Sequence, residues 1–416
     1  MLRHLPPCTS QYLLSLYNWI WESSSVPEDW LDAVVLPVRK PGSLGTSPKD
    51  FRPIALTSCV CKLFERMVNV RLMWFLEHHH LLSPSQFGFR KCRSTTDVLV
   101  NLEVYIRTDF AAKTSIVAVL FDLEKAYDTT WRYHILSQLH SFGLRGHLPL
   151  FLRSFLSRRS FRVRLGTALS ASFQQYEGVP QGSVLSTTLF LVALNGLLSS
   201  LPSGVFSALY VDDLTLCCQG DDSPLLQRRL QLAIDAVSSW ATDHGFKFST
   251  SKTCAMTFTR KRVVLRPSLS LYGHKLEYKD SAKLLGLFLD TRLSWSPHIS
   301  YLRVECSKAL TLLRVLSILL GGQIGALSLL YIPLLSCLSS IMVALLTRLL
   351  LLLLFAVLML CTILGCASVL VPFVRLPSLA CMLTLASCLS RTAVIATVFV
   401  LLRGPYNILP LASVVL

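Results

Sequence analysis

Acidic residues are missing from the last quarter of the chain. From Cys306 to Leu416 there is no Asp or Glu, and only six of the 40 Lys and Arg residues lie there. Residues 1–305 therefore hold the other 34 cations and all 24 acids. This basic majority favours a polyanionic partner, because Lys and Arg neutralise phosphates and release their counterions. The last quarter has almost no charged residues, and its composition is not typical of a protein that binds polyanions.

The thirteen cysteines also lack the spacing of a cysteine-rich domain. No Cys-x-x-Cys pair occurs anywhere in the chain, which excludes the usual zinc knuckle and gives no disulfide framework. The first residues, Met1–Pro7, lack the apolar stretch of a secretory signal. These absences favour an intracellular protein, in the nucleus or the cytoplasm.

The hydrophobic pattern predicts an α+β domain built on an antiparallel sheet. Ser115–Phe121 is a short apolar run of the kind found in a sheet that is buried on both faces. Two further runs, 206–210 and 214–218, are separated by three residues and predict a hairpin. Helical spacing of apolar residues covers 58–80 and 223–244. Strands separated by helices, with a hairpin among them, are typical of the α+β class.

Acidic residues stand at the ends of these predicted strands. Asp122 follows the first run, and Asp212 and Asp213 lie at the tip of the predicted hairpin. If both elements pair in one sheet, three carboxylates meet at one edge and repel one another unless cations lie between them. Mg²⁺ prefers carboxylate and phosphate oxygens, and two such ions promote in-line phosphoryl transfer. A lone Asp pair is more often a solvated loop, so the neighbouring motifs matter.

Three motifs in a fixed order distinguish these alternatives. The segments Phe121–Asp128, Gly178–Ser183 and Tyr210–Asp213 resemble motifs A, B and C of reverse transcriptases. Further segments extend the resemblance to the non-LTR retrotransposon branch from about residue 11 to about residue 316: Pro27–Trp30, Val35–Pro41, Phe51–Ser58, Gln86–Arg90, Arg93–Thr95, Gly245–Phe248, Ser251–Thr253, Lys283–Leu287 and Leu293–Ile299.

The resemblance implies a right-hand polymerase and its reaction. Its fingers would lie in residues 1–114 together with an insertion at about 130–180, its palm in 115–289, and a partial thumb in 290–316. The implied function is RNA-directed DNA synthesis, with an RNA template, a DNA primer and deoxynucleoside triphosphates as partners and no obligate protein partner. The chain would hold the polymerase core only, since nothing in it resembles an endonuclease or a ribonuclease H.

The resemblance also assigns roles in catalysis. Asp122, Asp212 and Asp213 would ligate two Mg²⁺ ions, with Mn²⁺ as an alternative and with help from the carbonyl of Leu123. Tyr127 would lie under the nucleotide sugar and exclude a 2′-hydroxyl.

Other roles concern the substrates. Lys40 and Arg52 would grip the triphosphate through charge-assisted hydrogen bonds. Gln181 and Gly182 would line the nucleotide pocket, and Leu285 and Gly286 would form the primer grip. Lys252 would protonate the departing pyrophosphate, although a phosphate-facing surface lysine explains it equally well.

Two positions depart from the family pattern. Thr187 stands where the family usually has proline, and Cys92 stands where glycine is common. Neither position belongs to the carboxylate set, but each is expected to loosen a turn.

The apolar tail, residues 317–416, has two explanations. Leu349–Val374 carries no charge and is long enough to span a bilayer. However, Trp is absent after Trp295, so the aromatic belts of membrane spans are missing. Plausible codons for Ile318–Gly325, read one frame over, give residues that resemble the family's sequence after its thumb helix. We therefore expect a frameshift product, and a one-nucleotide correction near Ser317 should restore a charged region.

Three alternatives to an active reverse transcriptase remain open from the sequence. An RNA-templated RNA polymerase shares the palm, but Tyr127 stands near the position where those enzymes place a sugar-reading acid. A membrane-anchored protein would be defined by the tail. An inactive retrotransposon remnant would keep every carboxylate and still fail to polymerise.

Overall fold

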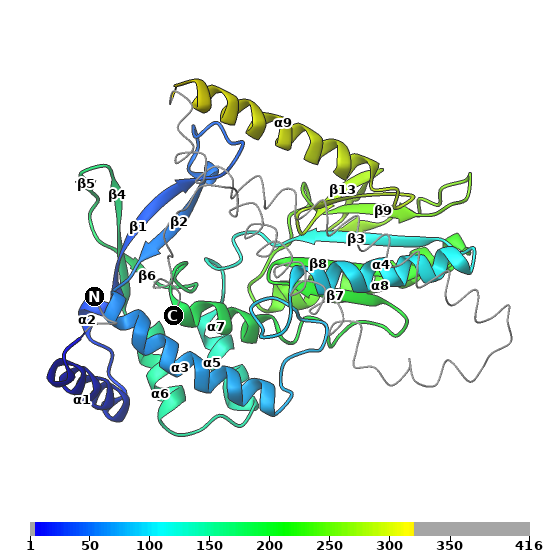
Figure 1. Ribbon diagram of the computed structural model, residues 1–416. Coiled ribbons are helices and arrows are strands. Elements are labelled where there is room, and N and C mark those ends of the chain that lie inside the picture. The colour runs from blue at the N-terminus through cyan, green and yellow to red at the C-terminus, as the bar shows by residue number, and fades with distance from the viewer. Residues whose placement is uncertain (1–4, 320–416) are drawn as a thin grey trace, which may run out of the picture. The chain divides into compact units, whose positions relative to one another are not determined.

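The computed structural model describes residues 5–319 (Figure 1). The chain divides into two units, Met1–His298 and Ile299–Leu416. Helix α9 (Ser296–Leu319) begins at the end of the first unit, and its remainder is the described part of the second. The predicted tail lies almost entirely outside the described residues. Within residues 5–319, no helix is both long enough and apolar enough to cross a membrane.

The palm sheet is one of two five-stranded sheets in the first unit. Its five strands run in the order β12-β9-β3-β8-β7. Their bounds are β12 (Glu277–Tyr278), β9 (Cys254–Phe258), β3 (Ile116–Asp122), β8 (Asp213–Gln219) and β7 (Phe206–Tyr210). All neighbours are antiparallel except β12 and β9. The expected α+β class with an antiparallel palm is confirmed.

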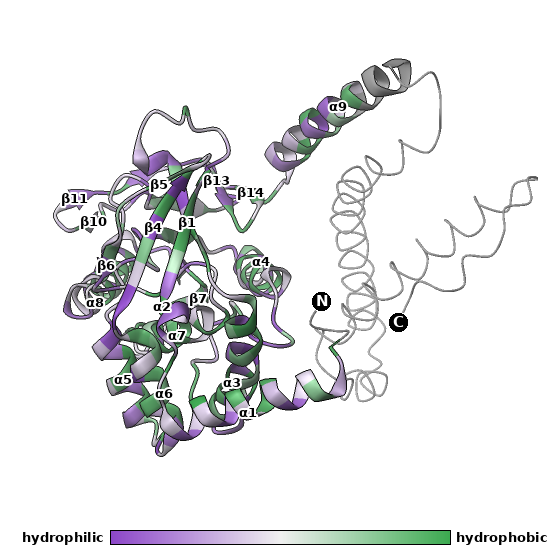
Figure 2. Ribbon diagram, turned by 90° about the vertical axis from the view of Figure 1, so that its left-hand side faces the viewer, coloured by the Kyte–Doolittle hydropathy of each residue, from purple (hydrophilic) through white to green (hydrophobic). Residues whose placement is uncertain are grey.

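The central strand β3 is buried on both faces, as its continuous apolar sequence predicts. Ile116 and Ala118 belong to one core cluster with helix α4 (Thr95–Ala111), while Val117 and Val119 belong to another with helix α8 (Ser223–Asp243). These two helices lie on opposite sides of the sheet (Figure 2). Burial of Ile116, Val117 and Val119 contributes about 1.5–3 kcal/mol for each side chain, so both faces stabilise the sheet.

The fingers sheet also has five strands, but it is more open. It contains β2 (Phe51–Leu56), β1 (Asp32–Arg39), β4 (Arg159–Leu165), β5 (Ala168–Leu169) and β6 (Phe173–Gln175). The first two strands form an antiparallel hairpin, and β1 pairs in parallel with β4. The last three strands come from the segment at about 130–180 that the sequence assigns to a fingers insertion. The exact domain boundaries stay a prediction.

Helices connect the two sheets. Those outside the palm faces are α1 (Pro7–Ser23), α2 (Glu28–Leu31), the 3₁₀ helix η2 (Pro48–Asp50), α3 (Cys59–His78), α5 (Arg132–Ser141), α6 (His147–Leu156) and α7 (Val184–Leu194). Helix α7 is apolar around its whole circumference and buried along most of its length, because α3 and α5 pack against it. Two short hairpins complete the unit: β10 (Ser270–Leu271) with β11 (His274–Lys275), and β13 (Ser281–Leu284) with β14 (Leu287–Asp290).

Candidate polymerase active site

The three predicted carboxylates lie at one edge of the palm sheet. Strand β3 ends at Asp122 and β8 begins at Asp213, and the antiparallel register places these two residues directly opposite each other. Asp212 belongs to the two-residue turn between β7 and β8. Strand pairing therefore brings together residues that are about ninety positions apart in the sequence, as the paired-sheet argument requires.

The turn that carries Asp212 has a strained backbone. Val211 has a φ of 60°, which is uncommon for a β-branched residue, although two-residue hairpin turns favour positive φ. The neighbouring segment Ser85–Gly88 holds this turn from the side. The amide of Phe87 donates to the carbonyl of Leu209 at 2.8 Å, and the amide of Leu209 donates to the carbonyl of Ser85 at 2.9 Å.

Gly88 fits against the turn because it has no side chain. A Cβ atom at Gly88 would lie 2.5 Å from Cγ2 of Val211 and 2.7 Å from its amide nitrogen. The sequence assigns Gln86–Arg90 to the fingers by resemblance and gives no sign of this contact. A glycine within a family motif was the only available signal.

The carboxylates influence one another electrostatically. Burial, together with the negative charges of Asp212 and Asp122, raises the pKa of Asp213 to about 6. Burial is also the main cause of the raised pKa of Asp212, and the negative charge of Asp122 raises this pKa as well. Arg52 and Lys252 oppose this shift. The edge therefore concentrates negative charge that a cation would stabilise.

Lys252 is the cation that contacts this edge. Its Nζ donates to Oδ2 of Asp122 at 2.9 Å. In the part of the chain that the structure describes, no three His, Cys, Asp or Glu side chains are grouped so that they could hold a metal ion. The chemistry of the three candidate donors suits a divalent ion, since Asp122, Asp212 and Asp213 all offer carboxylate oxygens. The assignment of Asp122, Asp212 and Asp213 as metal ligands stays a prediction.

The predicted nucleotide-binding loop, Gly178–Ser183 (the nucleotide loop), packs against the fingers. The amide of Ala55 in β2 donates to the carbonyl of Gln181 at 2.7 Å. Gly182 has a φ of 128°, and a Cβ there would lie 2.3 Å from the carbonyl oxygen of Ala55. Only glycine fits this position, so the predicted pocket residues Gln181 and Gly182 sit where fingers and palm meet.

The same loop is tied to the motif that carries Asp122. The amide of Val179 donates to the carbonyl of Tyr127 at 2.9 Å. Gly178 has a φ of 75°, and a Cβ there would lie 2.6 Å from the carbonyl oxygen of Asp128. Nε of Arg132 donates to the carbonyl of Gly178 at 2.8 Å. The sequence assigns no individual role to Gly178 or Arg132, because the groups that they contact are backbone carbonyls.

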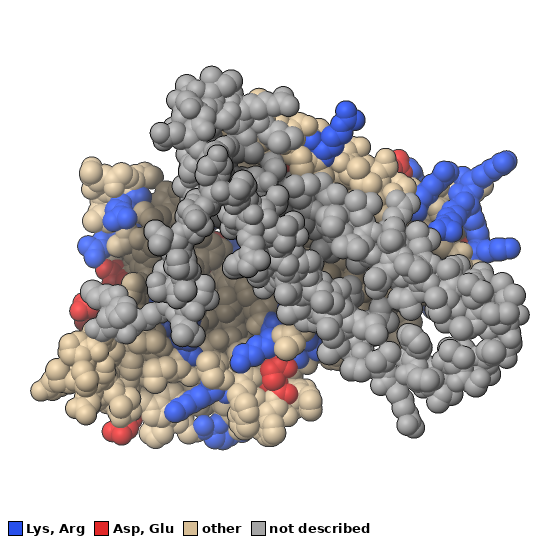
Figure 3. Space-filling model, in the orientation of Figure 1, with Lys and Arg blue, Asp and Glu red and all other residues tan. Residues whose placement is uncertain are grey.

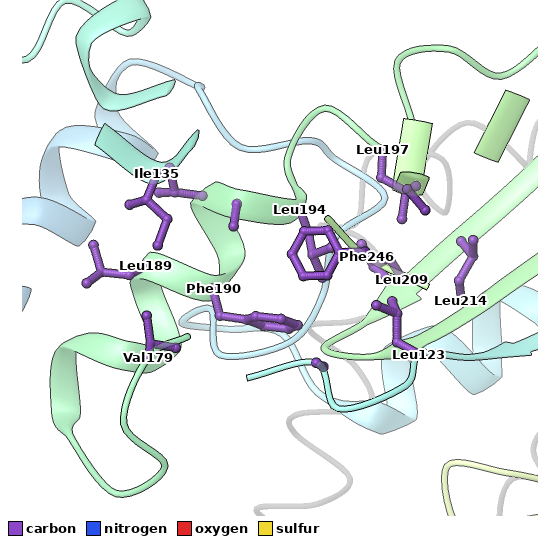
Figure 4. Packing of buried hydrophobic residues seen from close by; sticks show 14 of the residues in the cluster. Leu123, Ile135, Val179, Leu189, Phe190, Leu194, Leu197, Leu209, Leu214 and Phe246 are labelled. Atoms are coloured by element: carbon purple, nitrogen blue, oxygen red, sulfur yellow. The ribbon is translucent and has the colours of Figure 1, made fainter. Parts of the chain in front are cut away.

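Tyr127 is held by ring stacking. Its ring lies 4.8 Å from that of Phe190 on α7 with an interplanar angle of 20°. Burial, with the charge of Asp212, raises the pKa of Tyr127 to about 12. Phe190 belongs to a packed group with Leu123 and Phe246 (Figure 4). A ring that is fixed in this way would exclude a 2′-hydroxyl by the space that the ring occupies.

The predicted triphosphate grip lies on the exposed β1–β2 hairpin. Arg52 pairs with Val38 across the hairpin, and its positive charge partly opposes the rise in the pKa of Asp212. Lys40 follows β1, and its Nζ donates to the carbonyl of Lys49 at 2.7 Å, within its own hairpin. Lys and Arg side chains outnumber acidic ones on the face shown in Figure 3.

Two other sequence predictions concern turns. Leu285 and Gly286 form the two-residue turn between β13 and β14, with φ of 46° and 93°. Contact with a primer stays a prediction.

Cys92 has a φ of 58°, the left-handed region that glycine adopts most easily, which explains the family's preference for glycine there. The expectation of a loosened turn at Thr187 is wrong, because Thr187 lies within α7, where its hydroxyl donates to the carbonyl of Val184 at 3.0 Å.

Comparisons with known proteins agree with this arrangement. Residues 38–302 match the family model described as reverse transcriptase (RNA-dependent DNA polymerase). The probable RNA-directed DNA polymerase from transposon BS of Drosophila melanogaster is 31% identical over 321 residues, which are 75% of this chain and 35% of that protein. The RNA-directed DNA polymerase from mobile element jockey of the same species is 27% identical over 305 residues, 72% of this chain and 33% of that protein. The chain thus spans about a third of the length of these relatives.

Solved structures similar to this chain include two telomerases. Apo telomerase from Candida tropicalis has a TM-score of 0.43 and 14% identity, and covers 69% of this chain and 59% of its own. Telomerase from Candida albicans in complex with a fragment of telomeric RNA has a TM-score of 0.45 and 14% identity, and covers 68% of this chain and 49% of its own. The family match spans more than half of the residues and includes every predicted site residue. The chain belongs to the reverse transcriptase family, in its non-LTR retrotransposon branch.

Proposed function

We propose that this chain adds deoxynucleotides to the 3′-hydroxyl of a DNA primer under the direction of an RNA template. The observation that carries the proposal is the direct pairing of Asp122 with Asp213 across β3 and β8, with Asp212 in the adjoining turn. The names of the relatives, RNA-directed DNA polymerases of mobile elements, support the same reaction. Template, primer and nucleotides are intracellular, so we place the activity there.

The carboxylate edge is the proposed site for two Mg²⁺ ions, with Mn²⁺ as a substitute. Asp122, Asp212, Asp213 and the Leu123 carbonyl are the oxygen donors that would hold them. When bound, such ions activate the attacking hydroxyl and stabilise the leaving oxygen. The raised pKa of Asp213, caused first by burial and then by two like charges, supports this role, because a cation would relieve the repulsion.

Lys252 has two positions in this proposal. In the described structure its Nζ is bound to Asp122. Because Asp122 is a proposed metal ligand, Lys252 would have to leave it when the substrates bind. Its side chain is 67% exposed, so this movement meets little resistance. The released Nζ would then carry a proton within reach of the departing pyrophosphate.

The other predicted residues would bind and select the substrates. Arg52 and Lys40 would hold the triphosphate, and the ring of Tyr127 would exclude a 2′-hydroxyl. Gln181 and Gly182 would face the base pair that is being formed. The turn at Leu285 and Gly286 would support the primer end.

A single-nucleotide addition assay tests the proposal. The full-length chain is mixed with an RNA template, an annealed DNA primer, one deoxynucleotide and Mg²⁺. We expect addition of one or a few nucleotides, without processive synthesis, because the sequence departs from the family after the start of the thumb. Asp122→Asn should abolish the product. A folded wild-type chain that adds no nucleotide would favour the inactive remnant.

A further inference from the structure

A buried carboxylate lies behind the nucleotide loop and is not among the predicted site residues. Glu65 lies in the first half of α3 and is 1% exposed. A buried carboxylate is costly unless hydrogen bonds and opposite charge compensate it. The contacts of Glu65 show where that compensation comes from.

Three donors at the start of α7 meet one oxygen of Glu65. The amides of Val184 and Leu185 donate to Oε2 at 2.7 Å and 3.1 Å. The hydroxyl of Ser183 donates to the same oxygen. Ser183 is the N-cap residue of α7, but its side chain makes no capping bond to its own helix. Glu65, which is 118 positions earlier in the chain, performs that capping instead.

The second oxygen of Glu65 is also satisfied. The thiol of Cys61, one helical turn earlier, donates to Oε1 at 3.3 Å. Burial, followed by the charge of Glu65, raises the pKa of Cys61, so the thiol stays protonated and able to donate. Arg159 in β4 is buried as well, and Glu65 is the main charge that favours its protonated form. The carboxylate therefore has a complete set of partners.

The helix start that Glu65 caps carries the nucleotide loop. Gln181 and Gly182 directly precede Ser183, and Gln181 is also bound to Ala55 of β2. Ala55 and Glu65 lie in the same stretch of chain as Arg52. One segment, residues 52–65, thus holds the loop at two points and also carries the proposed triphosphate grip.

We propose that Glu65 is a positioning residue for nucleotide binding. Its carboxylate fixes the start of α7, and thereby the distance between Gln181–Gly182 and the Arg52 side chain. This inference rests on the proposed function and deepens it, because it names the group that sets the geometry of the nucleotide pocket. A carboxylate needed only for folding would change stability without changing nucleotide affinity.

The test replaces the carboxylate with its neutral isostere. For Glu65→Gln in the full chain, we expect the KM for the deoxynucleotide to rise about tenfold while kcat changes less than about threefold, the pattern of lost substrate binding. Glu103→Gln is the matched control, because Glu103 also lies on a helix and binds a cation, Arg107, far from the loop in sequence. The control should leave both constants unchanged.

A second variant and a second readout guard against loss of folding or of activity. Ser183→Ala removes one of the three donors, so its KM should rise less, and combined with Glu65→Gln it should add little. Hydrogen exchange at the amides of Val184 and Leu185 should be faster in Glu65→Gln. If Glu65→Gln does not fold, Ser183→Ala is measured in both assays instead.

The outcomes separate the two proposals. Unchanged exchange at Val184 and Leu185 would overturn the positioning role, whatever the activity. Faster exchange with an unchanged KM in an active enzyme would overturn it too, because the cap would then be structural only. If the wild-type chain adds no nucleotide, the proposed function fails, and the exchange measurement alone decides whether Glu65 holds the loop.

Discussion

The palm and the fingers each contain a five-stranded sheet, but they hold their functional residues differently. In the palm, Ile116–Val119 are fully buried, and Asp122 follows from them by strand pairing. In the fingers, β1 and β2 are mostly half-buried or exposed, and Arg52 is exposed near the loop that connects these two strands. Packing on both faces fixes the proposed catalytic groups, while the proposed substrate grip lies on a more open hairpin.

This difference indicates that the nucleotide loop depends on contacts with both the palm and the fingers. Its palm contacts are to Tyr127 and Asp128, and its fingers contact is to Ala55. Substitutions at the rigid palm edge should therefore change the chemical step, and substitutions near the loop should change substrate binding or choice. The following experiments break or sharpen this comparison.

The largest effect is expected from Asp212→Asn. Because the variant removes a charge from the rigid carboxylate edge, single-nucleotide addition should fall by at least about a thousandfold. Binding of the RNA template should stay within about twofold, because phosphate contacts dominate that affinity. Asp243→Asn, at the exposed end of α8, is the control. Retention of a tenth or more of the activity would contradict the role of Asp212.

A smaller effect is expected from Gly88→Ala. The new Cβ would overlap Val211 and push the turn that carries Asp212. A misplacement of about 1 Å at a reacting group can lower the rate about a hundredfold, and we expect a loss of that order in kcat. At Gly196, the three atoms nearest to a Cβ would belong to the Trp240 side chain, at 3.0 Å or more, so Gly196→Ala is the control. Equal activity of the two variants would show that the turn does not depend on Gly88.

Sugar choice should change in Tyr127→Val. The ring of Tyr127 is fixed by Phe190, so its removal should open space for a 2′-hydroxyl. We expect the preference for deoxynucleotides over ribonucleotides to fall about 10- to 200-fold, the range for discrimination by volume. Competition between the two nucleotides in the addition assay measures this ratio. An unchanged ratio would place the sugar filter at another residue.

The smallest effect concerns stability at acid pH. Burial, with the nearby ring of His244 at 4.3 Å, lowers the pKa of His134. The unfolded chain therefore takes up this proton first as pH falls. The stability contribution is present above about pH 6.5 and is lost as pH falls through the lowered pKa. Denaturant unfolding measures the free energy of unfolding at pH 7.5 and at pH 5. His134→Gln should reduce the decrease in this free energy between the two pH values, and His140→Gln, at an exposed position, should not.

The sequence predicts the palm well because its signals are local. The apolar run before Asp122 and the paired runs around Asp212 need only strand periodicity to be read. The contact of Gly88 with Val211 and the cap formed by Glu65 are not predictable in the same way. Each joins segments that are more than a hundred residues apart, and neither leaves a periodic pattern. Lys252 illustrates the same limit, since its bond to Asp122 depends on side-chain placement that no motif specifies.

Mn²⁺ binding to the folded chain tests the central claim, that the palm edge is a metal site, most directly. Electron paramagnetic resonance of free Mn²⁺ measures the affinity for wild type and for Asp122→Asn, Asp212→Asn and Asp213→Asn. The proposed ligand set predicts that each substitution weakens binding by at least about tenfold, while Asp243→Asn leaves it unchanged. Equal Mn²⁺ affinity in wild type and all three variants would contradict the claim.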